Sequence, residues 1–98
     1  MTDSYALTTA NFETIIDFLR FGLSKANASE LYYGHGTDNA WDDILALVSG
    51  CLGLPADCDP LLYQARLTQE EKQLLANKLA RRIIDRVPVP YLTNEAYF

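Results

Sequence analysis

This sequence has little of what secreted and membrane proteins need. Among its 98 residues there is no apolar run close to the roughly 20 residues that span a membrane. The N-terminal segment MTDSYALTT lacks the basic and apolar regions of a secretory signal. We therefore predict a cytoplasmic protein that does not contact a membrane. Its two cysteines, Cys51 and Cys58, are expected to be free thiols because a reducing compartment disfavours disulfides.

Groups that bind metals or cofactors are also scarce. The single histidine, His35, and the two cysteines would leave a zinc ion without a fourth ligand, and they lack the short cysteine spacings of zinc sites. The closely spaced Gly34 and Gly36 lack the preceding apolar strand and the third glycine of a dinucleotide-binding loop. We therefore predict no metal site and no cofactor site in this chain.

Positive charge is nearly absent from the first part of the chain. Residues 1–60 hold nine acidic and two basic residues, a net charge of −7, whereas residues 61–98 hold six basic and four acidic residues. Phosphate binding needs clustered positive charge, so direct binding of nucleic acid is not expected. An acidic surface would instead attract a basic protein.

The residues that are present follow helical periodicity. Apolar side chains recur at three- and four-residue steps from Thr9 onward, again over residues 40–52 after a possible N-cap at Asn39, and again after Thr68 and Glu71, which match a capping box. Pro60 can begin a short turn between the last two segments. This pattern predicts an all-α fold, a small orthogonal helical bundle.

Two prolines near the C-terminus predict a change of structure. Pro88 and Pro90 should end the helix that precedes them and hold residues 87–90 in an extended connector. The β-prone residues Tyr91 to Thr93 could then begin a strand. We therefore divide the chain into a helical domain, residues 1–87, and an extended C-terminal tail or connector, residues 88–98.

Residues 31–43, LYYGHGTDNAWDD, form the segment richest in chemical groups. His35 could act as a general base, but no nucleophile is evidently paired with it, and a loop histidine that fixes a turn is the alternative; we predict no catalytic residue. Trp41 is expected in the core and Tyr33 at the surface. The aspartates Asp38, Asp42 and Asp43 could bind a basic partner or favour the start of a helix.

Three strings, LYYGHGTDNAWDD, ARLTQEEK and RVPVPYLTNEAYF, occur in this order. Together they closely resemble the N-terminal region of the bacterial ribosomal-protein glutamine methyltransferases, the PrmB family, which is related to the release-factor methyltransferases (PrmC or HemK). The match covers most of residues 12–98. It implies a helical N-terminal domain, truncated here before a Rossmann-like domain that binds S-adenosylmethionine.

The resemblance also implies an activity for the whole enzyme. Family members transfer a methyl group to the side-chain amide of a glutamine in the third large-subunit ribosomal protein, a basic protein. Their glycine-rich methyl-donor loop and Asn-Pro-Pro-Tyr tetrapeptide are absent from this sequence. We therefore expect this chain alone to be inactive and to bind no cofactor.

Substrate recognition is the role that we expect for the domain. The candidate substrate-binding residues are Tyr33, His35, Asp38 and Asn39, because they belong to a loop that is too polar to be all core. A packing role against the chain's own catalytic domain is the alternative for these residues. At the level of the whole chain, the alternatives are a purely structural inter-domain brace and an independent protein-interaction adaptor.

Overall fold

The protein is a bundle of helices, as the sequence predicts. The computed structural model describes residues 3–31, 33, 39–55 and 57–96. The elements are α1 (Asp3–Thr8), η1 (Thr9–Asn11), α2 (Ile15–Ser29), α3 (Ala40–Leu52), η2 (Pro60–Gln64), α4 (Gln69–Ile83) and α5 (Val89–Ala96), where η marks a 3-10 helix. Within the described residues, no helix is long and apolar enough to cross a membrane.

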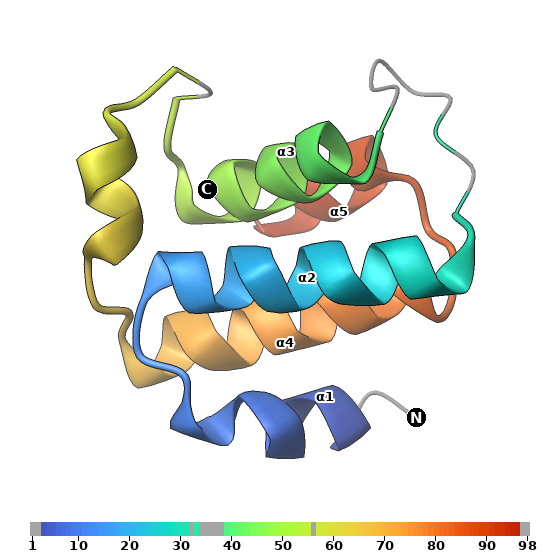
Figure 1. The fold of residues 1–98 in the computed structure, drawn as a ribbon, viewed down its shortest axis with the longest axis horizontal. Helices are drawn as coiled ribbons and strands as arrows, with labels where there is room; N and C mark the ends of the chain where they lie inside the picture. The colour runs from blue at the N-terminus through green and yellow to red at the C-terminus, as the bar shows by residue number, and fades with distance from the viewer. Residues whose placement is uncertain (1–2, 32, 34–38, 56, 97–98) are drawn as a thin grey trace.

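The helices are arranged in layers (Figure 1). α2 and α4 lie side by side in the middle, α3 and α5 pack on one side of them, and α1 packs on α4 on the other side. η2 closes one end of the bundle, where it contacts α2. α2 and α3 run in opposite directions, whereas α3 and α5 run in the same direction.

The start of α2 differs from the prediction. The helix begins at Ile15 and not near Thr9, because Thr14 and Asp17 form a capping box. The Thr14 amide donates to Asp17 Oδ2 at 3.0 Å, and Thr14 Oγ1 accepts from the Asp17 amide at 3.4 Å. These bonds satisfy amides that would otherwise lack partners at a helix start. Residues before the cap form the separate elements α1 and η1.

The other two long helices lie where the sequence places them. Asn39 caps α3, which ends where Gly53 adopts a left-handed conformation with φ 73°. The predicted capping box of Thr68 and Glu71 begins α4. The predicted turn at Pro60 is η2, whose first amides are capped by Asp59. Local side-chain signals thus define these boundaries.

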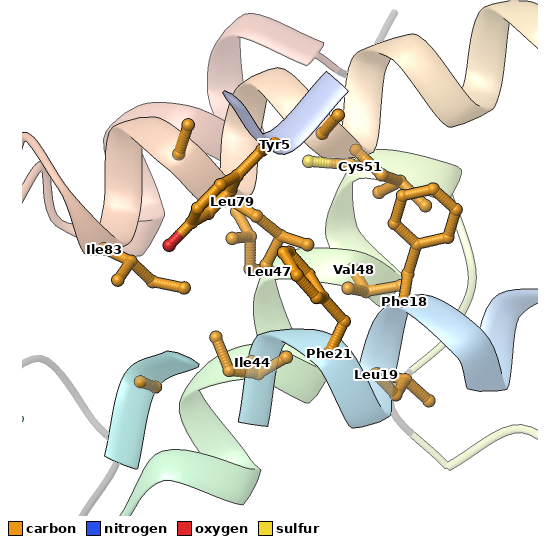
Figure 2. Close-up of a cluster of buried hydrophobic side chains, with 14 of the residues drawn as sticks. Tyr5, Phe18, Leu19, Phe21, Ile44, Leu47, Val48, Cys51, Leu79 and Ile83 are labelled. Carbon is orange, nitrogen blue, oxygen red and sulfur yellow. The ribbon is translucent and has the colours of Figure 1, made fainter. Parts of the chain in front are cut away.

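One hydrophobic core joins all five α-helices (Figure 2). Its fully buried side chains include Phe18 and Leu19 of α2, Ile44 of α3 and Leu79 of α4. Aromatic rings extend it to α1, where Tyr5 meets Phe21 edge to face at 5.0 Å between ring centroids. α1 therefore belongs to the folded unit.

Gly22 allows α2 to approach its neighbours closely. A Cβ atom at this position would lie 2.9 Å from Cγ2 of Ile44 and 3.0 Å from Cδ2 of Leu79. Both distances are well inside van der Waals contact, so α3 and α4 occupy the space that a side chain would need.

The prediction of an extended C-terminal tail is wrong for residues 89–96, which form α5. Pro90 lies in the first turn of this helix, where its missing N–H requires no partner. Leu92 is fully buried in the core, and Glu95 bonds to Lys78 and Arg81 of α4. The prolines therefore begin a helix, and no strand forms at residues 91–93. That residues 88–98 link to a further domain stays a prediction.

A single antiparallel β-bridge between Thr14 and Arg66 connects the segments that precede α2 and α4. The Ile15 amide donates to the Ala65 carbonyl at 3.2 Å, and the Leu67 amide donates to the Glu13 carbonyl at 2.8 Å. Thr14, the cap of α2, is itself part of the bridge, and Thr68, the cap of α4, follows Arg66 by two residues. It thus sets where α2 and α4 begin relative to each other.

Candidate functional site

The first turn of α3 carries two of the polar groups that the sequence singles out. Asn39 Oδ1 accepts a hydrogen bond from the Asp42 amide at 2.9 Å, and Asn39 Nδ2 donates to Asp42 Oδ2 at 3.2 Å. Both residues are exposed. Asn39 therefore caps the helix, as predicted, and Asp42 places an exposed carboxylate at its positive end.

Asp43, one residue further, has a different role. Its carboxylate accepts hydrogen bonds from Arg82 Nε at 2.8 Å and from Arg82 Nη2 at 3.1 Å. Both side chains are only 5% exposed, so the pair is buried between α3 and α4. Of the two roles left open for Asp43, binding a basic partner is thus unsupported, because an arginine of the same chain occupies its carboxylate.

The sequence contains a signal for this pair. Positions 75, 79 and 82 of α4 are three and four residues apart, so Leu75, Leu79 and Arg82 share one face of the helix. Leu75 and Leu79 are fully buried, and Arg82 is buried beside them. Arginine on an apolar helix face needs a buried carboxylate.

Tyr33 lies beside this ion pair. Its ring packs partly buried against the hydrophobic core. Burial raises the pKa of its hydroxyl, and the nearby Asp43 carboxylate raises this pKa further, whereas Arg82 lowers it. Tyr33, expected at the surface, is thus partly exposed and partly packed against the core.

The expectation for Trp41 is wrong. Its side chain is 38% exposed and is not part of the core. Trp41 lies on the same flank of α3 as Leu45, which is half-buried, whereas Ile44 and Val48 face inward. The indole is thus available for contact with another molecule.

Of the four candidate substrate-binding residues, the structure places two. His35 and Asp38 lie outside the described residues. Asn39 and Tyr33 both connect to Asp43, because the Asp43 amide donates to the Asn39 carbonyl at 3.1 Å and the Asp43 carboxylate acts on Tyr33. Both placed candidates therefore lie close to Asp43.

The acidic character of residues 1–60 is partly compensated within the fold. Glu13 pairs with Arg66 at 3.4 Å, Asp43 pairs with Arg82, and Asp17 is engaged in the α2 cap. The basic partners come from the second part of the chain, so the asymmetry in sequence is larger than the asymmetry in space. Among the described residues of this part, the exposed acids are Glu13, Glu30, Asp42, Asp57 and Asp59.

Nothing in the described residues resembles a catalytic or cofactor site. A hollow of about 470 Å³ lies between the ends of α3 and α5. Its described lining residues, among them Gly50, Gly53 and Thr93, carry no ionisable side chain. Side chains of neighbouring helices fill the space beside Gly22 and Gly50, so neither glycine can bind a nucleoside or phosphate group. No group of three or more metal-ligating side chains occurs within this part of the chain.

The two cysteines are free thiols, as predicted. Cys51 is buried in the core, and burial raises the pKa of its thiol to about 11. Because a nucleophilic cysteine needs a lowered pKa, Cys51 has a packing role.

Known proteins that are similar to this chain include two enzymes of the same name. The chain is 43% identical over 93 residues to the ribosomal protein uL3 glutamine methyltransferase of Xanthomonas campestris, a match that covers 95% of this chain and 30% of that protein. It is 44% identical over 85 residues to the enzyme of the same name from Xylella fastidiosa, covering 87% of this chain and 27% of that protein. No family model and no solved structure matches. The chain thus spans about 30% of the length of these relatives.

Proposed function

Since this chain is similar over nearly its whole length to one segment of the uL3 glutamine methyltransferases, we propose that it is the N-terminal substrate-recognition domain of such an enzyme. The observation that carries the proposal is the 43% identity over 95% of the chain. The ordered core from α1 to α5 supports a domain that folds as one unit.

In this proposal, the whole enzyme transfers a methyl group from S-adenosylmethionine to the side-chain amide of a glutamine in uL3, in the cytoplasm. The described residues offer no site that fits S-adenosylmethionine, so the cofactor and the catalytic groups would belong to a separate catalytic domain. This chain alone would then bind the substrate without methylating it.

Two features support recognition over a purely structural brace. The exposed indole of Trp41 lies next to the exposed carboxylate of Asp42, and an aromatic ring beside a carboxylate suits lysine- or arginine-bearing segments. The buried Asp43–Arg82 pair holds this turn of α3 against α4, so the exposed groups are presented from a rigid base.

Titration of the isotopically labelled chain with purified uL3, followed by amide chemical shifts, tests the proposal. We expect saturable shifts in the first turn of α3 that weaken as salt is raised, because surface charges are screened. If no amide shifts at any salt concentration, this chain does not recognise uL3, and the brace is favoured.

The activity assay addresses the enzyme as a whole. The longer protein should transfer labelled methyl groups to uL3, and this chain should transfer none. Methylation by this chain alone would contradict the proposal that the catalytic groups lie elsewhere.

A further inference from the structure

The pair formed by α2 and α3 has an outer edge that no described element covers. In Figure 1 the two antiparallel helices lie in the front layer, with α4 and α5 behind them. They approach closely where Ile44 packs against Gly22. The side chains on the outer side of this contact can therefore meet another molecule.

Apolar residues follow this edge at helical spacing. Ile16 and Leu23 are seven residues apart on α2, and Trp41, Leu45 and Leu52 are four and seven residues apart on α3. Residues at these separations share one face of a helix. Ile16 and Trp41 are 41% and 38% exposed, and the other three are half-buried. We call these five residues the α2–α3 seam.

A hollow of about 180 Å³ lies at one end of the seam. Apolar side chains line most of it, among them Ile15, Leu52 and Leu54. Its rim also carries Glu71 and Arg66, and Arg66 pairs with Glu13. The volume resembles that of cavities of about 150 Å³ that accept a benzene molecule. The hollow can therefore take one apolar side chain from outside the domain.

Exposed carboxylates lie at both ends of the seam. Asp42 neighbours Trp41 at one end, and Asp57 and Asp59 lie in the segment between Leu54 and η2 at the other end. On the α2 side, Arg20 is exposed and donates to Ser24 at 3.4 Å. Apolar side chains between negative ends complement a segment in which apolar side chains are flanked by lysine or arginine.

From these observations we infer that the α2–α3 seam binds an apolar segment of a basic protein, with one apolar side chain in the hollow and basic side chains at Asp42 and Asp57. The inference rests on the proposed function, which supplies uL3 as the basic protein. The inference adds which surface of the domain binds uL3.

The single tryptophan gives a direct test. Replacement of Trp41 by 5-fluorotryptophan provides one fluorine resonance at the end of the seam. Addition of unlabelled uL3 should shift and broaden this resonance until it saturates. Amide shifts recorded in the same titration should follow the seam residues.

Substitutions separate the seam from the rest of the surface. Trp41→Ser and Ile16→Ser should each weaken uL3 binding about tenfold, because each removes one of the two most exposed apolar side chains of the seam. Leu7→Ser is the control, since Leu7 is 79% exposed but lies on α1; it should change binding less than about twofold. Circular dichroism establishes that each variant is folded.

The outcomes distinguish the inference from the proposed function. Amide shifts that avoid the seam, with an unchanged fluorine resonance, would overturn the inference and leave recognition of uL3 intact. No shift anywhere would overturn both. A fluorine resonance that moves with the concentration of the chain alone would assign the seam to a second copy and overturn the inference.

Discussion

At the scale of single residues, the Asp43–Arg82 pair is the most deeply buried ion pair among the described residues. Both side chains are buried, and the carboxylate accepts two hydrogen bonds from the guanidinium. Removing two charges from water costs free energy. The attraction and the hydrogen bonds between the two side chains offset this cost.

Arg82→Met should therefore destabilise the fold by about 3–5 kcal/mol, because it removes both hydrogen bonds that the guanidinium donates to the buried Asp43 carboxylate. Urea denaturation measures the change. The double variant Asp43→Leu/Arg82→Met should recover much of the loss. Arg66→Met is the matched control: it breaks the exposed pair with Glu13 and should cost less than about 1 kcal/mol. Equal losses for the two single variants would contradict this account.

Glu95 provides a second residue-scale prediction. Hydrogen bonds from Arg81 and then from Lys78 lower the pKa of its carboxyl to about 2. Because the pKa is lower in the folded state, the stabilisation is present above the ordinary pKa of 4.5 and is lost as pH falls towards 2.

Melting temperatures measured between these pH values test this prediction. The parent protein should melt higher than Glu95→Gln at neutral pH, and the difference should shrink as the pH falls from about 4.5 towards 2. The variant keeps the shape of the side chain, so it removes mainly the charge. A difference that is independent of pH would show that the charge of Glu95 is not involved.

At the scale of the elements, α5 depends on its contact with α3. A Cβ atom on Gly50 would lie 2.6 Å from Cγ2 of Thr93 and 3.1 Å from its Cβ atom. The two helices can therefore pack at this distance only because residue 50 has no side chain.

Gly50→Ala should destabilise the protein by about 2 kcal/mol, as expected for overpacking. In an exposed helix the same change would stabilise by about 1 kcal/mol. The sign of the change in the free energy of unfolding therefore shows whether residue 50 is packed against α5. Thermal unfolding measures the effect. Thr93→Ala should rescue part of the loss by removing Cγ2. If Gly50→Ala is more stable than the parent, α5 does not pack on α3 in this way.

The same elements explain what could be predicted from sequence. α3 and α4 were placed correctly because their caps, Asn39 and Thr68, are local signals that act within one turn. α5 was missed because a proline can end one helix or begin the next, and Pro90 begins α5 only in the presence of a core that accepts Leu92.

The candidate site was less predictable for a related reason. Trp41 and Arg82 each lie in the environment that is unusual for their residue type: the indole is exposed, and the guanidinium is buried. Hydrophobicity alone assigns them the other way round. Only the pairing of Arg82 with Asp43, from a helix far away in sequence, makes the buried position favourable.

At the scale of the whole molecule, the net charge of −5 should govern encounter with a basic partner. Opposite charges raise the association rate, and salt screens this effect over distances of about 10 Å. Contacts at the interface itself control dissociation to a larger extent.

Stopped-flow or surface-based kinetics with uL3 should therefore show an association rate constant that falls from low to moderate salt, with a dissociation rate constant that changes little. Asp42→Asn should reduce this salt dependence slightly without unfolding the protein. Asp17→Asn makes the same change in charge but also weakens the α2 cap. An effect of net charge should appear in both variants, whereas a loss of stability should appear in Asp17→Asn alone. If salt changed only the dissociation rate constant and left the association rate constant unchanged, electrostatic steering would be contradicted.

The β-bridge between Thr14 and Arg66 has a consequence for how the molecule folds. Joining these residues closes a loop of about 50 residues, whose length-dependent entropy cost is roughly 3.5 kcal/mol. The helices within and beside that loop can form from local contacts, but the bridge requires both ends of the loop to meet. The amides of Ile15 and Leu67 are therefore positions where hydrogen exchange would follow the closing of this loop.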